Sequence, residues 1–244
     1  MSVANAPHPQ TGALGSGSPR LDISTSYDHG AILYRYPCGA VEVVCNPKTT
    51  DFPHRDRVTT PDKARDRGVE VARRAATQFR RAALAADLRY LLTTTYRENL
   101  LDYPSSKGHI QAVLRGLRRR HSGLRYVGAP EMQKRGAWHW HVLLDRRIEA
   151  AEVRELWRDQ VGDGNIDLQH FRDPVRGALY AAKYVRKGFG EFRVPGVRYL
   201  RSRNIEVQCE KATQSAAYEF LAAGGWSGEV FALDTGGWWA ASWR

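Results

Sequence analysis

From Arg89 onward the chain alternates between two hydrophobic periodicities, and this alternation restricts the possible folds more than any other feature. Segments rich in β-branched and aromatic residues indicate strands at residues 90–96, 125–133, 137–144 and 165–171. Apolar residues that recur every three or four positions indicate helices at residues 106–121, 150–161 and 174–187. The order β-α-β-β-α-β-α predicts an α+β fold with a central antiparallel β-sheet flanked by helices.

This alternating part of the chain is predicted to lie between segments of different composition. Residues 1–50 are expected to form a largely flexible N-terminal extension, although residues 40–44 alternate like a short strand. Residues 51–88 form a basic segment that is predicted to be helical from about position 63, and residues 89–205 form the main domain. Residues 206–244 form a Trp/Gly-rich C-terminal extension, whose rings either dock on protein or stack on bases.

The charge balance indicates a polyanionic partner. The 244 residues include 37 Lys and Arg against 26 Asp and Glu, which gives a net charge of +11. Nucleic acid is the commonest polyanion that such a chain meets, and a basic surface without a specific partner is the alternative. Residues 107–135 contain eight basic and one acidic residue, and residues 183–203 contain seven and one. Two such stretches suit a groove that follows a phosphate backbone.

Other features of the composition argue against secretion and membrane insertion. The three cysteines, Cys38, Cys45 and Cys209, lack zinc-like spacing and are expected to be reduced thiols. No run approaches the roughly 20 apolar residues of a membrane span. The first thirty residues do not resemble a signal peptide. A cytoplasmic protein is therefore expected.

Two histidines alternate with two tryptophans in the predicted strand at 137–144. Because side chains alternate between the faces of a strand, His139 and His141 share one face, and Trp138 and Trp140 share the other. Two imidazoles side by side can hold one cation. The alternative is a pair of half-buried or solvent-facing histidines without a ligand.

The preceding strand supplies a third candidate ligand. If the turn at 134–136 is centred on Arg135, then Glu131 lies opposite His139 and shares its face. Pro130 leaves the pairing open, because a slip of two residues would place Glu131 opposite His141. The sequence therefore predicts a metal site, with a simple salt bridge from Glu131 as the alternative.

The predicted helix at 174–187 has two distinct faces. Counted at 100° per residue, the apolar stripe that is predicted to face the core comprises Val175, Ala178, Leu179, Ala182 and Val185. A second stripe comprises Arg176, Tyr180, Lys183, Tyr184 and Lys187. Helical tyrosines are most often packing residues, but these two lie among cations, one turn apart. Such a surface suits a phosphodiester beside a phenol oxygen.

Further basic residues are predicted to bind DNA. Those on the helix at 106–121 lie off its apolar stripe and should attract phosphates without sequence preference; they are Lys107, Arg115, Arg118 and Arg119. Those near the tyrosine helix and in the segment after it are Lys187, Arg198, Arg201 and Arg203. The segment 198–204 is expected to take part in sequence choice.

Taken together, these motifs resemble those of HUH endonucleases. The segment His139-Trp140-His141 resembles their metal-binding signature, and residues 180–185 resemble the Tyr-x-x-Lys-Tyr helix of rolling-circle replication initiators. The two-tyrosine form is typical of initiators from single-stranded DNA phages and related plasmids. Residues 92–96 are similar to the family's first motif, and residues 131–141 to the phage form of its metal hairpin. The resemblance covers about residues 88–205 and implies a ferredoxin- or RRM-like sheet in an HUH endonuclease domain.

The resemblance implies an enzyme that nicks and rejoins single-stranded DNA at a replication origin through a 5′-phosphotyrosine. Tyr184 occupies the position that single-tyrosine relatives keep, Tyr180 would alternate with it, and Lys183 would assist. Glu131, His139 and His141 would bind Mn²⁺ or Mg²⁺, with Zn²⁺ less favoured. The chain has no P-loop sequence, so a host helicase and polymerase are expected partners in a bacterial cytoplasm.

Two alternatives stay open. A relaxase or single-strand transposase would use the same chemistry, but usually needs one tyrosine rather than two. A non-catalytic nucleic-acid-binding module on a similar sheet would stack bases on aromatic residues. Such a module has no reason to place His-x-His opposite a glutamate.

Overall fold

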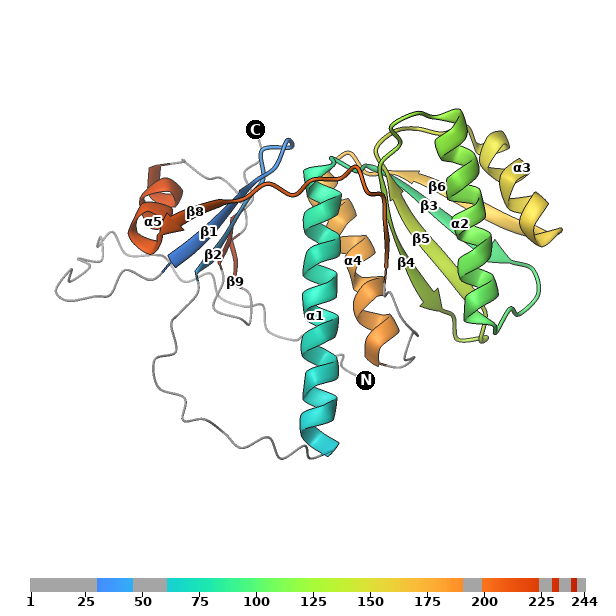
Figure 1. Cartoon of the computed structure of the whole chain (residues 1–244), viewed down its shortest axis with the longest axis horizontal. Coiled ribbons are helices and arrows are strands. Elements are labelled where there is room, and N and C mark those ends of the chain that lie inside the picture. Colours follow the sequence, from blue (N-terminus) through green and yellow to red (C-terminus); the bar gives the residue numbers. More distant parts are fainter. Residues whose placement is uncertain (1–29, 46–60, 191–198, 224–229, 233–237, 241–244) are drawn as a thin grey trace, which may run out of the picture.

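The computed structural model describes residues 30–45, 61–190, 199–223, 230–232 and 238–240 (Figure 1). Within these residues the chain forms five helices and two five-stranded sheets, in which all paired strands are antiparallel. The predicted α+β class, with an antiparallel sheet flanked by helices, is confirmed.

The central sheet has the strand order β6-β3-β5-β4-β7. Its strands are β3 (Tyr90–Tyr96), β4 (Tyr126–Met132), β5 (Trp138–Leu144), β6 (Gly164–His170) and β7 (Leu200–Arg201). The four predicted strands are confirmed. The short strand β7 was not predicted, and it extends the sheet by pairing with β4 at Val127 and Gly128.

Two helices, α2 (Tyr103–Arg120) and α3 (Ala150–Val161), cover one face of the central sheet (Figure 1). Both were predicted. Asp102 begins α2 by accepting a hydrogen bond from the backbone N–H of Ser105 at 2.8 Å. The core on this side is closed by large apolar side chains, chiefly Ile110, Leu114, Trp140 and Trp157. Trp140 belongs to this side, so the tryptophans of β5 face α2 and α3.

The opposite face of the central sheet is covered by α4 (Pro174–Gly190), and α1 (Pro61–Ala85) packs on α4. Asp173 caps α4 by accepting from the backbone N–H of Val175 at 2.8 Å. Val127, Ala129 and Leu143 point into this second core. By alternation along β5, the two histidines also lie on this face.

A second sheet, with the order β8-β1-β2-β10-β9, joins the two ends of the described chain. It consists of β1 (Gly30–Arg35), β2 (Val41–Cys45), β8 (Glu210–Thr213), β9 (Val230–Ala232) and β10 (Trp238–Ala240). One of its faces packs on α5 (Gln214–Ala223) through Ala31, Leu33, Val43 and Ala217.

The second sheet corrects the interpretation of residues 1–50 and 206–244 as separate extensions. Residues 30–45 are strands, and they pair with segments about 170 to 200 positions later in the chain, such as Ala31 with Ala212 and Val43 with Trp238. Each strand alone buries too little surface to be stable, so the two extensions fold only together. Trp238 and Trp239 lie in β10, while Trp226 and Trp243 lie outside the described residues.

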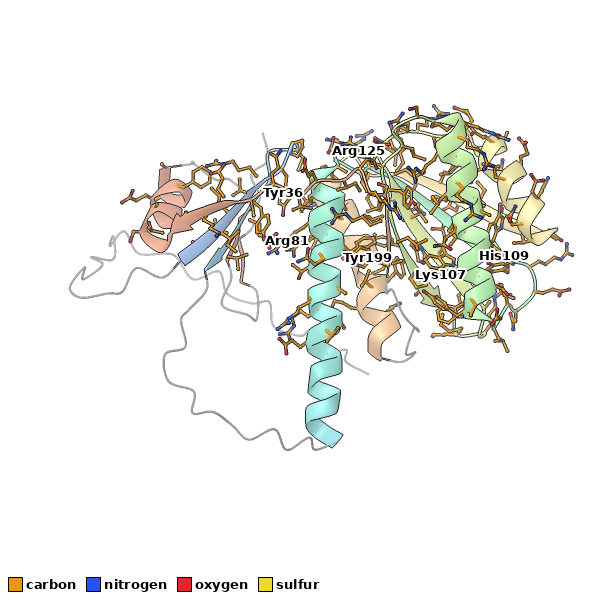
Figure 2. All side chains as sticks on the ribbon, in the orientation of Figure 1. Tyr36, Arg81, Lys107, His109, Arg125 and Tyr199 are labelled. Carbon is orange, nitrogen blue, oxygen red and sulfur yellow. The ribbon has the colours of Figure 1, made fainter. Side chains whose placement is uncertain are left out.

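A buried ion cluster connects the second sheet to α1. Glu42 of β2 is fully buried and pairs with Arg80 at 3.0 Å and Arg81 at 2.6 Å, both from α1, and accepts a hydrogen bond from the Tyr36 hydroxyl at 3.0 Å. Tyr36 and Arg81 lie between the sheet and the helix (Figure 2). Burial alone would raise the pKa of Glu42, but the two arginines and the hydroxyl outweigh it, so the pKa lies below its usual value.

Two remaining sequence predictions concern the cysteines and the membrane. Cys38 and Cys209 are free thiols, and the side chain of Cys45 lies outside the described part. No helix in the described residues is long and apolar enough to span a membrane.

Candidate active site

The candidate site is built on the hairpin of β4 and β5. Gln133 and Gly136 close its turn with backbone hydrogen bonds of 2.9 Å, Gln133 N–H to Ala137 and Gly136 N–H to Gln133. Gly136 has a φ of +89°, a conformation that favours glycine. The resulting register places Glu131 opposite His139, as predicted. Because paired residues share a face, Glu131, His139 and His141 all lie on the side covered by α4.

Glu131 connects a histidine of the sheet to a lysine of α4. Its Oε2 lies 2.8 Å from Nε2 of His141, and its Oε1 accepts a hydrogen bond from Lys187 Nζ at 3.0 Å. On the far side of the imidazole, His141 Nδ1 lies 3.2 Å from the Thr93 hydroxyl. Burial acts to raise the pKa of Glu131, but hydrogen bonds from His141 and Lys187 outweigh it and lower the pKa.

His139 differs from His141 in having no hydrogen-bond partner for one of its ring nitrogens. The side chain is buried, and within the described residues nothing hydrogen-bonds to its Nε2. Burial lowers the pKa of His139 to about 4, and the charges of His141 and Arg135 add to this effect. The imidazole is therefore neutral at ordinary pH and retains a lone pair, which is the form that binds a metal.

The donor set suits a divalent cation, but the side chains as they stand do not yet surround one. Among the described residues, no three His, Cys, Asp or Glu side chains converge on a point where a metal could sit. The reason is the direct hydrogen bond between His141 and Glu131, which occupies the atoms that would face the ion. The buried and unpartnered Nε2 of His139 is the observation that favours a missing ligand.

The tyrosine helix is rotated relative to its prediction. Leu179, predicted to face the core, is 41% exposed, whereas Tyr184, predicted to lie on the open basic face, is only 6% exposed. Ala181 is also fully buried. The reason is that α4 packs on α1 as well as on β4 and β5, so nearly half of its circumference is covered. Tyr184 lies at the edge of this covered half, and Tyr180 lies outside it.

Tyr184 is held against the candidate metal ligands. Its ring stacks on the imidazole of His141 with centroids 3.6 Å apart, and its hydroxyl donates a hydrogen bond to the Tyr180 hydroxyl at 2.9 Å. Burial, the bond to Tyr180 and the nearby charge of Glu131 raise the pKa of Tyr184 well above its usual value. In this arrangement the Tyr184 hydroxyl is protonated.

Lys183 places a positive charge beside both phenols. Its Nζ lies 3.5 Å from the centroid of the Tyr180 ring and 4.7 Å from that of Tyr184. Tyr180 is 38% exposed and also packs against Phe171. Of the two hydroxyls, that of Tyr180 is therefore the more accessible to a substrate.

Arg135 holds the hairpin turn against the loop that follows β3, a role that the sequence did not suggest. Its guanidinium donates to the carbonyls of Tyr96 at 2.6 Å and Arg97 at 3.2 Å, and to the Asn99 side chain at 2.9 Å. Asn99 returns a hydrogen bond to the Arg135 carbonyl at 2.8 Å. The positive charge of Arg135 is thus largely used to fix the turn beside the site.

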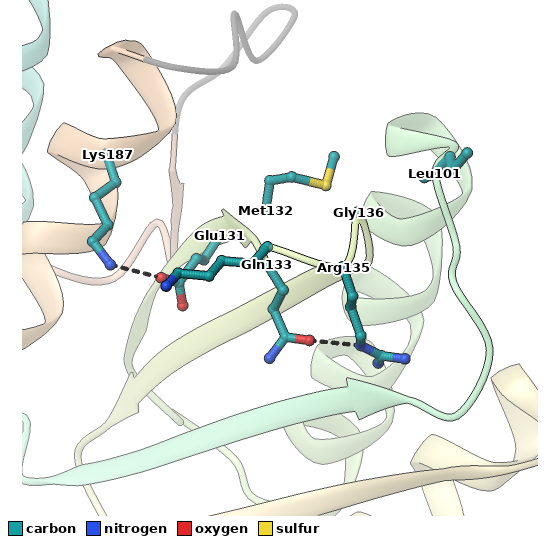
Figure 3. A pocket seen from close by; sticks show the side chains of 8 residues that line it. Leu101, Glu131, Met132, Gln133, Arg135, Gly136 and Lys187 are labelled. Carbon is teal, nitrogen blue, oxygen red and sulfur yellow. Dashed lines mark hydrogen bonds and ion pairs between the residues drawn. The ribbon is translucent and has the colours of Figure 1, made fainter.

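An open pocket adjoins the site at the hairpin end. It has a volume of about 850 Å³, and Glu131 and Lys187 form one of its walls (Figure 3). The remaining lining residues are Leu101, Met132, Gln133, Lys134, Arg135 and Gly136. A chain leaving the tyrosines past Glu131 would enter this pocket.

Polar residues of β3 and β6 continue the same face of the sheet, and sequence patterns did not single them out as a group. Thr93 pairs with both His141 and Asp167, and Thr95 pairs with both His139 and Asn165. These residues therefore lie on the histidine side, where Asn165 and Asp167 are exposed. The signal was present in the alternation of the predicted strand, but needed the strand order to be useful.

The predicted DNA-binding residues fall into separate groups. Lys187 lies in the site through its bond to Glu131. The arginines of α2, namely Arg115, Arg118 and Arg119, are exposed on the opposite side of the sheet, and Lys107 is half-buried on the same helix. Arg201 and Arg203 are exposed in and after β7, at the end of β4 away from Glu131. Arg198 lies outside the described residues. The two basic stretches thus do not line a single groove beside the tyrosines.

Residues 89–189 match the model of a family of replication-associated proteins, which is described by ORF2 and the gene 2 protein. The matched segment includes β3 to most of α4 and therefore every candidate metal ligand and both tyrosines. The match supports a role in DNA replication. No curated protein matches the chain. Among solved structures, the hypothetical protein ORF119 from Sulfolobus islandicus rod-shaped virus 1 is similar, with 9% identity and a TM-score of 0.30 over 53% of this chain and 97% of that chain.

Proposed function

We propose that this protein initiates DNA replication by nicking and rejoining single-stranded DNA at an origin, with a tyrosine nucleophile and a divalent metal. One observation carries the proposal. Tyr184 stacks on His141, and His141 is bonded to Glu131, so a nucleophile and two candidate ligands form one contact group. This group lies in the segment that matches replication-associated proteins.

Glu131, His139 and His141 would hold the metal, and two imidazoles with one carboxylate suit Mn²⁺ or Mg²⁺, with Zn²⁺ less favoured. The metal would polarise a non-bridging oxygen of the scissile phosphate. For this the hydrogen bond between His141 and Glu131 has to open, while Thr93 continues to orient the imidazole from its other side. Lys187 would keep Glu131 ionised until the metal arrives.

The tyrosine oxygen would attack the scissile phosphorus, while the bond from phosphorus to the 3′ oxygen breaks. The products are a 5′-phosphotyrosine and a 3′-hydroxyl, which takes up the proton that the attacking tyrosine loses. Because the pKa of Tyr184 is raised, ionisation needs positive charge nearby, and Lys183 provides it beside both rings. Rejoining reverses the step without ATP, because the phosphotyrosine ester conserves the energy of the broken bond.

The tyrosine pair favours a replication initiator over a relaxase or single-strand transposase of the same chemistry. The two hydroxyls are in hydrogen-bond contact, so either could reach one phosphate after a small shift. The resemblance makes Tyr184 the first nucleophile and Tyr180 the second. Unwinding and synthesis would come from a host helicase and polymerase.

The test is a labelled single-stranded oligonucleotide that contains the cognate nick site, incubated with the full chain and Mn²⁺. We expect a protein–DNA adduct that survives denaturant, and a double substitution His139→Ala, His141→Ala should abolish it. Removal of the metal with a chelator should do the same. Binding without any adduct, with each metal tried, would instead identify a non-catalytic nucleic-acid-binding module.

A further inference from the structure

Three arginines form a basic cluster on α2, away from the candidate active site. Arg115, Arg118 and Arg119 are spaced one helical turn apart and all are exposed. On the same helix, Gly116 packs toward α3, and the apolar stripe faces the sheet. The arginines therefore point away from both, and the sheet separates them from Tyr184.

The next residue along the helix shows what sets these arginines apart. Arg120 is paired with Glu155 at 2.9 Å and lies 3.8 Å from Glu152, both in α3. By contrast, the described part of the chain offers Arg115, Arg118 and Arg119 no ion-pair partner. Three neighbouring cations without counter-charges repel one another, and an external polyanion would relieve that repulsion.

The cluster borders a shallow hollow that has further backbone and basic groups beside it. The hollow has a volume of about 430 Å³ and is lined by the three arginines with Ser122 and Gly123. Asn204 donates a hydrogen bond to the Gly123 carbonyl at 2.9 Å, which brings the exposed Arg203 next to this region in the chain. Two basic groups that are far apart in sequence thus meet on one surface.

The chemistry of the surface favours duplex DNA over a single strand. Surfaces that bind single strands combine cations with aromatic rings on which bases stack. None of the described residues that line this hollow is aromatic. Bare arginines suit a phosphate backbone, whose duplex form carries the higher charge density.

We propose that Arg115, Arg118 and Arg119, with Arg203 beside them, bind the phosphate backbone of double-stranded DNA. This second nucleic-acid surface is separate from the tyrosine site. The choice of DNA as the polyanion rests on the proposed function. A duplex held on α2 and a single strand held at α4 would lie on opposite sides of one sheet, so the protein could keep hold of the duplex part of an origin while the exposed strand is cut.

The experiment compares two triple variants that lose the same charge. The first is Arg115→Gln, Arg118→Gln, Arg119→Gln. The control is Arg35→Gln, Arg74→Gln, Arg97→Gln, whose arginines are exposed and ion-paired with Glu210, Glu70 and Asp163. Binding of a 20-base-pair duplex and of a 20-nucleotide single strand is measured by fluorescence anisotropy at several salt concentrations. Circular dichroism checks that both variants are folded, and Arg118→Gln alone serves as a milder version.

We expect the α2 variant to bind the duplex at least about tenfold more weakly near 0.1 M salt, and its salt dependence to flatten by about 0.9 for each lost phosphate contact. The control should change duplex binding less than threefold, and adduct formation on a single strand should be preserved in both variants. Equal losses in the two triple variants would overturn the proposal. A parallel loss of duplex binding and single-strand nicking would also overturn it, because one path would then serve both. Duplex binding is scored without catalysis, so a parent protein that fails to nick would refute the proposed function alone.

Discussion

The phenol ring of Tyr184 lies flat on the imidazole of His141, with 3.6 Å between the ring centroids and 9° between the ring planes. This contact joins α4 to the middle of the central sheet. It also means that any movement of the tyrosine helix is felt at a candidate metal ligand. The two parts of the proposed mechanism are therefore mechanically coupled.

The first prediction concerns the division of work between the tyrosines. Tyr184→Phe keeps the ring on His141 and removes only the hydroxyl, so adduct formation should fall by about 100-fold or more while DNA binding is maintained. Tyr180→Phe should still nick once but release circles poorly. Mass spectrometry of the trapped adduct locates the DNA. An adduct found only on Tyr180 would reverse the roles, and DNA on neither tyrosine would contradict the mechanism.

A second prediction separates metal binding from DNA binding at Lys187. Its ammonium group is bonded to Glu131 and competes with a metal for the same carboxylate. Lys187→Met should therefore strengthen Mn²⁺ binding by about two- to fivefold, because the pair is partly exposed, but weaken DNA binding. Isothermal titration measures the first effect and anisotropy the second. Arg186→Met, an exposed neighbour, is the matched control, and an unchanged Mn²⁺ affinity in Lys187→Met would count against this arrangement.

A third prediction tests the hairpin that sets the register of the site. Gly136→Ala should lower the free energy of unfolding by about 1–2 kcal/mol, since alanine is strained at a φ of +89°. The added methyl would also lie 3.2 Å from a carbon of Leu101. Gly108→Ala in α2 is the control, because nothing lies within 4 Å of its added methyl and alanine favours helices. Thermal unfolding should show opposite shifts, and equal stability of the two variants would contradict the strained turn.

The fourth prediction concerns pH and the buried Glu42. Its pKa in the folded protein lies below the unfolded value, so the stability it contributes is present above about pH 4.5 and is lost as the pH falls through the folded-state pKa. Glu42→Gln should cost about 3–5 kcal/mol at neutral pH, because two buried arginines lose their counter-charge. The difference in unfolding free energy between parent and variant should shrink below pH 4.5. A difference that stays constant down to pH 3 would exclude this role.

The hairpin was predictable from sequence because its geometry is local. A short turn containing a glycine fixes the register, and alternation then fixes which side chains share a face, so Glu131 could be placed opposite His139 in advance. The bonds from Thr93 and Lys187 were not predictable in this way. They depend on which strand and which helix become neighbours of β5, and a linear pattern does not contain that information.

The burial of Tyr184 was missed for a similar reason. A helical wheel that places one apolar stripe against one core suits a helix with a single neighbour, whereas α4 contacts both α1 and the sheet. Small residues such as Ala181 then become core residues although they add little to the apolar pattern. The second sheet was missed because β1 and β8 are short and pair across most of the chain, as Ala31 does with Ala212.

The packing of α1 on α4 has a consequence for how a working fragment would have to be cut. Phe79, Ala82 and Ala83 of α1 share a buried core with Ala178 and Ala181 of α4. A fragment that begins at residue 89, where the family match starts, would expose that surface of the tyrosine helix to water. The helix would then lose the contacts that press Tyr184 onto the sheet. An autonomous nicking unit therefore has to begin at or before residue 61, so the catalytic half of the protein is longer than the segment that resembles other proteins.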